Sequence, residues 1–103
     1  MWYLIYAVVP RGRAGNVIRI AEKAGSQGGT IIHGKGIGRK PKRFLNFEVE
    51  PMRDVIWIIV NEKDYQEVSQ AIYDSCDLEE EGQGVLFVEP LNSVYGLVEQ
   101  VDE

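Results

Sequence analysis

Two short glycine-rich segments are the parts of this sequence best suited to bind a ligand. The first, Gly34–Lys40, alternates glycine with other residues and ends in two cations, and the second, Gly82-Gln83-Gly84, comes just before an apolar run. Glycine lets a backbone approach a ligand closely, and successive N–H groups in such turns can point at an anion. Because Arg39 and Lys40 add positive charge, the two segments together suit a phosphate-bearing ligand. Each segment alone is also typical of an ordinary turn.

The remaining candidates for catalysis or metal binding are isolated. His33 is the single histidine and Cys76 the single cysteine, so neither a zinc set nor a disulfide framework can be built. His33 has no serine or thiol partner at a recognisable spacing, and no Walker, HExxH or nucleophile-elbow motif is present. We therefore expect a protein without enzymatic activity and without a metal, in which Cys76 is a small buried hydrophobe.

Length and charge limit the classes of partner. The chain has 103 residues, the size of one domain, and a formal net charge of −5. An acidic protein is a poor general ligand for nucleic acid, whereas the local basic run between Lys35 and Arg43 suits a small anion or a specific partner. The first apolar run, Trp2–Val9, is too short for a signal peptide or a membrane span. We expect a soluble, cytoplasmic protein that binds no nucleic acid and does not insert into membranes.

The hydrophobic pattern predicts four strands and two helices. Continuous runs of apolar and β-branched residues predict strands, and apolar residues every three or four positions predict helices. The predicted strands are Trp2–Val9, Thr30–Ile32, Val55–Val60 and Val85–Val88, and the predicted helices cover Ala14–Ala24 and Tyr65–Cys76. Asn61 and Asp64 are interpreted as a capping pair that opens the second helix. The order βαββαβ predicts an α+β, ferredoxin-like fold, with a four-stranded antiparallel sheet and two helices on one face.

The other face of this predicted sheet has no element left to cover it. Trp2–Val9 and Val55–Val60 are apolar at successive positions, so they place apolar side chains on both faces. An exposed apolar face of that size indicates a protein partner, and we expect the chain to self-associate through its sheets. Residues 1–103 are then one domain, with a connection over residues 40–52 and a C-terminal tail over residues 91–103.

The glycine-rich segments also carry a family resemblance. Gly28–Ile31 followed by Gly34–Arg39 resembles the second-strand motif of the PII signal-transduction (nitrogen regulatory) proteins. Gly82–Val88 resembles their glycine-rich turn and final strand, and Pro10 matches the end of their first strand. The likeness covers most of the chain, in the same order and with the same spacing.

The resemblance implies a function. PII proteins are homotrimers that bind adenine nucleotides in the three clefts between subunits, and they control transporters or metabolic enzymes through a mobile loop. In this sequence that loop is shortened to about residues 40–52. The implied ligand is an effector, not an obligatory cofactor, and ADP, AMP, ATP and a cyclic nucleotide are the candidates.

Carried over to this sequence, the resemblance also implies which residues line the cleft. One wall consists of Thr30, Gly36, Ile37, Gly38, Arg39 and Lys40, and the phosphate-facing turn of the neighbouring wall consists of Gly82, Gln83 and Gly84. Both walls are needed for one ligand, so the implied site lies between two copies of the chain.

Several positions depart from the PII pattern. Lys40 stands where the family has a glutamine that helps to bind 2-oxoglutarate, and Val85 stands where it has a lysine. A further phosphate-binding lysine of the family falls on or near Val55, and the tail Ser93–Leu97 lacks the family's arginines. Each lost charged hydrogen bond weakens binding by about 1.5–3 kcal/mol. These departures, with the absence of tyrosine from residues 40–52, argue against 2-oxoglutarate sensing and uridylylation.

Two other functions use the same architecture. A structural or metal-binding trimer similar to CutA-like proteins would need a cluster of ligands, and His33, Cys76 and scattered carboxylates are a poor one. An acylphosphatase-like enzyme would need an anion-binding loop after the first strand, which Arg11-Gly12-Arg13 resembles faintly. It would also need an asparagine beside the third strand, and Asn46 is badly placed for that role.

Overall fold

The computed structural model describes residues 1–35, 42–44, 47–49 and 52–97. Four strands form one antiparallel sheet in the order β2-β5-β1-β6, and two short strands form a separate pair, β3-β4. The elements in chain order are β1 (Trp2–Pro10), α1 (Ala14–Lys23), β2 (Thr30–Lys35), β3 (Lys42–Phe44), β4 (Phe47–Val49), β5 (Met52–Asn61), α2 (Tyr65–Ser75) and β6 (Val85–Leu91).

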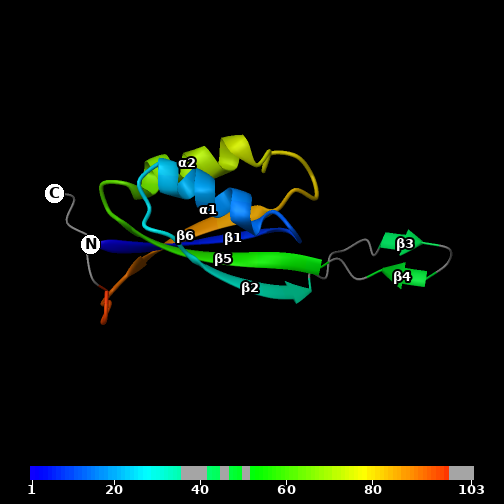
Figure 1. Ribbon diagram of the computed structural model, residues 1–103, viewed down its shortest axis with the longest axis horizontal. Helices are drawn as coiled ribbons and strands as arrows, with labels where there is room; N and C mark the ends of the chain where they lie inside the picture. The colour runs from blue at the N-terminus through cyan, green and yellow to red at the C-terminus, as the bar shows by residue number, and fades with distance from the viewer. Residues whose placement is uncertain (36–41, 45–46, 50–51, 98–103) are drawn as a thin grey trace.

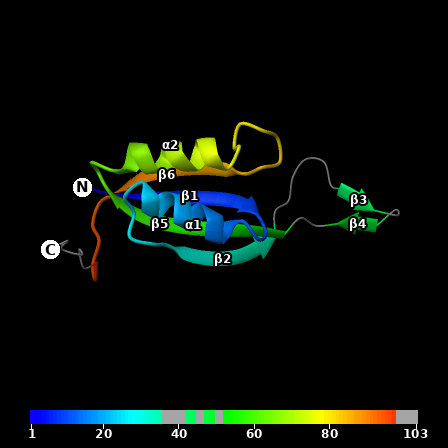
Figure 2. The same cartoon turned by 45° about the horizontal axis from the view of Figure 1, so that its top comes forward.

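Both helices lie on the same side of the sheet, as Figures 1 and 2 show from two directions. The two outer strands, β2 and β6, flank the central pair β5 and β1. This arrangement confirms the predicted ferredoxin-like fold with an antiparallel four-stranded sheet. No helix in the described part of the chain is long and apolar enough to cross a membrane.

The core lies between the sheet and the helices. Alternate residues of β1 and β5 point toward the helices, as expected for a pleated strand with one covered face. The buried apolar side chains are Ile5, Ala7 and Val9 of β1, Ile56, Ile58 and Val60 of β5, Ala14, Val17 and Ala21 of α1, and Val68 and Ile72 of α2. Cys76 is also buried, as predicted. Each large apolar side chain contributes about 1.5–3 kcal/mol by its burial.

The opposite face of the sheet is apolar, and no described element covers it. Tyr6 lies at its centre, with its ring stacked on Phe87 (centroids 4.8 Å apart) and edge-on to Trp57 (6.1 Å). The Tyr6 hydroxyl donates a hydrogen bond to the Glu89 carboxylate over 2.9 Å. We call this surface the open face, and its large exposed side chains include Ile32, Trp57, Ile59, Val85 and Phe87. The sequence therefore correctly predicted apolar residues on both faces of the sheet.

Two local predictions need correction. The third long strand begins at Met52, three residues before its predicted start at Val55, and residues 42–44 pair with residues 47–49 beyond the sheet (Figure 1). Asp64 is the N-cap residue of α2, but its side chain makes no capping hydrogen bond. Instead, the Asn61 side-chain oxygen accepts a hydrogen bond from the Lys63 backbone N–H (3.3 Å).

Candidate functional site

The Gly82–Gly84 turn leads into β6 at one end of the sheet, and its two glycines differ in environment. Gly84 has a φ of +129°, and a β-carbon there would collide with the Val8 carbonyl oxygen and lie 3.2 Å from the Val9 α-carbon. Gly82 has a φ of +85°, and a β-carbon there would have nothing within 4 Å. Packing against β1 therefore accounts for Gly84, whereas the backbone around Gly82 is open to a ligand.

Arg53 supplies a cation to this turn. Its guanidinium Nη1 donates a hydrogen bond to the Gly82 carbonyl oxygen over 3.1 Å. Arg53 is the second residue of β5 and is paired with Gly34 of β2 on one side and Pro10 of β1 on the other. Its side chain therefore extends across β1 to reach the turn before β6. Sequence reasoning did not select Arg53, because this contact depends on the strand order.

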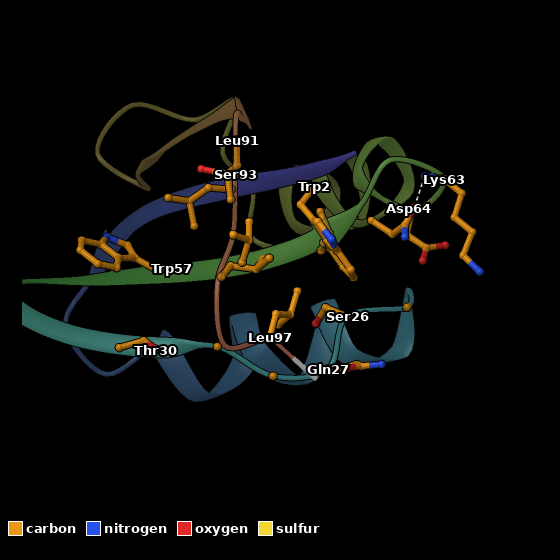
Figure 3. A pocket seen from close by; sticks show the side chains of 18 residues that line it. Trp2, Ser26, Gln27, Thr30, Trp57, Lys63, Asp64, Leu91, Ser93 and Leu97 are labelled. Carbon is orange, nitrogen blue, oxygen red and sulfur yellow. Dashed lines mark hydrogen bonds between the residues drawn. The ribbon is translucent and has the colours of Figure 1, made fainter. Parts of the chain in front are cut away.

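Thr30 lies in a separate groove on the open face, which has a volume of about 900 Å³ (Figure 3). The groove combines a glycine-rich loop, residues of all four strands of the sheet, the two residues before α2 and the tail. Its lining residues are Trp2, Leu4, Gly25, Ser26, Gln27, Gly28, Gly29, Thr30, Trp57, Ile59, Val60, Asn61, Lys63, Asp64, Leu91, Ser93, Val94 and Leu97. The chain after Leu91 crosses the sheet in Figure 3, which brings Leu97 near Ser26 and Gln27.

The groove offers both flat apolar surface and polar groups. The indoles of Trp2 and Trp57 lie in its wall, and aromatic rings of this kind can stack on a planar ligand. The Ser26 hydroxyl oxygen is buried and has no hydrogen-bond partner among the described residues. An unsatisfied buried hydroxyl is unfavourable by about 1–3 kcal/mol, so a polar ligand atom at this position would recover that free energy.

Within one chain, the groove and the Gly82–Gly84 turn do not meet. Thr30 is on β2 and the turn precedes β6, the two outer strands, which are about 14 Å apart at the usual strand spacing. In the register of the sheet, Thr30 is aligned with Phe87 of β6. Phe87 is three residues beyond Gly84, so the turn is offset from Thr30 by a further distance of about 10 Å along the strands. The other predicted wall residues, Gly36, Ile37, Gly38, Arg39 and Lys40, lie outside the described residues.

A buried carboxylate on the helix side of β5 organises the same end of the sheet. Asp54 is 2% exposed, and its carboxylate lies 2.6 Å from His33 Nδ1. It also accepts a hydrogen bond from the Gly12 backbone N–H over 3.0 Å and another from the Ala14 N–H. Burial alone raises the pKa of Asp54, but the hydrogen bonds from His33, Gly12 and Ala14 act in the opposite direction. The net effect places the pKa of Asp54 below its ordinary value.

Asp54 also occupies the backbone donors of the Arg11-Gly12-Arg13 loop. The backbone N–H groups of Gly12 and Ala14, at the start of α1, would be the donors of a phosphate-binding loop. Both bond the Asp54 carboxylate, which already provides the negative charge at this helix terminus. The arrangement therefore disfavours the acylphosphatase-like alternative, because the loop binds an anion from the chain itself.

Replacing Asp54 by asparagine is expected to reduce stability in a pH-dependent way. Because the pKa of Asp54 is lower in the folded state than in the unfolded chain, its charge stabilises the fold above about pH 4. That stabilisation is lost as the pH falls through the folded-state pKa. Near neutral pH the variant should lose about 2 kcal/mol, because a charged acceptor of three donors is removed. Urea unfolding of both proteins between about pH 3 and pH 7 measures the difference.

Asp74→Asn is the matched control for this prediction. Asp74 is an exposed aspartate on α2, where its carboxylate accepts one hydrogen bond from the Gln70 side chain (2.9 Å). Because its carboxylate is exposed, this variant should stay within about 0.5 kcal/mol of wild-type stability near neutral pH. An Asp54→Asn protein that follows the wild-type curve throughout would show that the buried carboxylate does not stabilise the fold.

The family model of the nitrogen regulatory protein P-II matches residues 2–100. No curated protein matches the chain with significance. In the part of the chain that the structure describes, no three histidine, cysteine or acidic side chains gather as a metal site would require. The matched span contains the groove, the Gly82–Gly84 turn and the His33–Asp54 pair.

Proposed function

This chain belongs to the nitrogen regulatory protein P-II family, and we propose that it binds an adenine nucleotide or a similar anion between its copies. Three copies form the assembly in this proposal, and each cleft joins the Thr30 groove of one copy to the Gly82–Gly84 turn of the next. In this proposal the bound ligand shifts the conformational equilibrium of residues 40–52, and these residues dock on a transporter or a metabolic enzyme in the cytoplasm. Such control requires that the ligand bind two states of the protein with different affinity.

The separation of the two half-sites within one chain is the observation that carries this proposal. Thr30 and the Gly82–Gly84 turn belong to opposite edges of the sheet, and the aromatic side chains of β1 and β5 stand between them. Within one chain a ligand would have to span roughly 17 Å across these side chains to touch both, whereas half-sites from different copies can lie side by side. The open face supplies apolar surface through which copies can associate, since large apolar patches mark protein interfaces.

The polar groups of the two half-sites support an anionic ligand with a planar part. The groove contains two indoles and the unsatisfied Ser26 hydroxyl, which suit a base and its ribose. The turn contains open backbone at Gly82 and the guanidinium of Arg53, which suit a phosphate. Arg53 partly offsets the missing lysine at Val85.

Isothermal calorimetry with ADP, AMP, ATP and cyclic AMP tests the nucleotide claim. Wild-type protein should release or absorb heat with at least one of the four. Gly38→Ala and Arg39→Ala should abolish that signal without separating the assembly. Removal of one charged hydrogen bond alone weakens binding at least about tenfold. Arg19→Ala is the control, because Arg19 is exposed on α1 and bonds only the Asn16 side chain among the contacts described for it.

An absence of heat with all four nucleotides would remove this function. Metal analysis of the same preparation distinguishes the CutA-like alternative, which requires bound metal in the purified protein. If Arg39→Ala gives the same heat of nucleotide binding as the wild type, the protein binds nucleotide but Gly36–Lys40 do not form the wall of the site.

A further inference from the structure

The tail that follows β6 forms part of the wall of the groove. The chain leaves β6 at Leu91 and crosses the open face, where Val94 and Leu97 line the groove. Tyr95 lies between these two residues in the sequence, but it is 91% exposed and is not among the lining residues. Gly96 has a φ of +84°, a left-handed conformation that glycine adopts without strain. The tail therefore places two aliphatic side chains in the groove and leaves its aromatic side chain in solvent.

The groove around this tail is aromatic and carries no net charge. Figure 3 shows the tail passing between the indoles of Trp57 and Trp2, and both indoles line the groove. Among its described lining residues the charged ones are Lys63 and Asp64, whose charges are opposite. Arg53, which bonds the Gly82–Gly84 turn, is not part of this wall. Such a site suits an uncharged planar group, since apolar and aromatic walls with few polar atoms are typical of small-molecule pockets.

We propose that Val94 and Leu97 are specificity residues that hold the uncharged planar part of the ligand against the two indoles of the groove. This inference rests on the proposed function and assigns the base and ribose of the nucleotide to the groove. The described tail after Leu91 contains no charged side chain, so it contributes by apolar contact and by excluding water, not by binding phosphate. The phosphate is then recognised only by the second half-site.

The partial exposure of Leu97 sets the size of the effect. Its side chain is 39% exposed, so a ligand in the groove can bury the remaining apolar surface. Replacing Leu97 by serine removes most of that apolar contact, and we expect about fivefold weaker binding. ADP, AMP, ATP and cyclic AMP share the same base and ribose, so the fold-change should be the same for each of them that binds.

The experiment compares nucleotide affinity in the wild type, Leu97→Ser, Val94→Ser and the control Tyr95→Ser by calorimetry. Leu97 and Val94 lie outside the buried core, so both variants should stay folded. Tyr95 belongs to the same tail but does not line the groove, so its replacement should leave affinity unchanged.

Tryptophan fluorescence gives a second measurement on the same samples. The chain has two tryptophans and both line the groove, so their emission reports directly whether the groove is occupied. Saturating nucleotide should change the emission of the wild type and of Tyr95→Ser. The nucleotide concentration at half-change should be about fivefold higher in Leu97→Ser.

The outcomes separate this inference from the proposed function. A uniform loss of affinity in Leu97→Ser, with none in Tyr95→Ser, supports the inference. Equal affinities in these two variants, or a loss that grows with the number of phosphates, overturn the inference and leave the proposed function standing. Calorimetric heat without a change in tryptophan emission does the same, because the ligand is then bound outside the groove. Wild-type protein that binds none of the four nucleotides overturns the proposed function, and the inference with it.

Discussion

Replacing Phe87 by glutamate is expected to separate the assembly into folded monomers and to abolish nucleotide binding. Phe87 is 49% exposed in a single chain and stacks on Tyr6 in the middle of the open face. If copies associate through this face, the new carboxylate is buried without a partner, at a cost of about 3–5 kcal/mol per copy. Glu89, two residues away on the same face, adds like-charge repulsion. Light scattering after size-exclusion chromatography should report a mass near 11.6 kDa.

Loss of binding in this variant would follow from separation of the half-sites. Phe87 is not among the residues that line the groove, so its replacement leaves the Thr30 wall of each copy intact. Circular dichroism checks that the monomer keeps its fold. Tyr73→Glu is the matched control, because Tyr73 is 41% exposed but belongs to α2 in the helix layer. A Phe87→Glu protein that keeps its mass and its nucleotide affinity would contradict association through the open face.

The fold was predictable because strand and helix signals agree with one another along most of the chain. The run Trp2–Val9 ends at a proline, and the apolar residues of α1 recur at helical spacing, so local pattern and tertiary burial coincide. The pattern failed at the start of β5, where Arg53 and Asp54 are charged. Charged residues do not fit the apolar pattern that predicts a buried strand, so the start of β5 was missed. In the folded chain these two charged side chains make hydrogen bonds, Arg53 to Gly82 and Asp54 to His33.

The candidate site was only partly predictable, because its contacts join distant positions. Arg53 and Gly82 are 29 residues apart, and His33 and Asp54 are 21 residues apart. Both contacts follow from strand order and register, which composition and spacing do not specify. A histidine and an aspartate on successive strands were a weak signal, since the pair meets only if β2 and β5 are neighbours in the observed register.

The two glycines of the turn before β6 should respond very differently to alanine. Gly84→Ala is expected to lower the free energy of unfolding by about 3–4 kcal/mol, because it combines left-handed strain with a collision against β1. Gly82→Ala should lower it by about 1 kcal/mol, because its β-carbon meets nothing within 4 Å and only the strain remains. Urea unfolding of both variants measures the difference.

Ligand affinity should be reduced more by Gly82→Ala than by Gly84→Ala, which is the reverse of their effects on stability. At a temperature where both variants are folded, the methyl group of Gly82→Ala occupies the open side of the turn, where the proposed ligand approaches. We therefore expect Gly82→Ala to reduce nucleotide affinity about tenfold or more, by removing close backbone contact with the phosphate. If both variants lose the same stability, the close contact with Val8 is not the reason that position 84 requires glycine. Unchanged affinity in Gly82→Ala would remove this turn from the ligand site, because no packing contact competes for the space beside it.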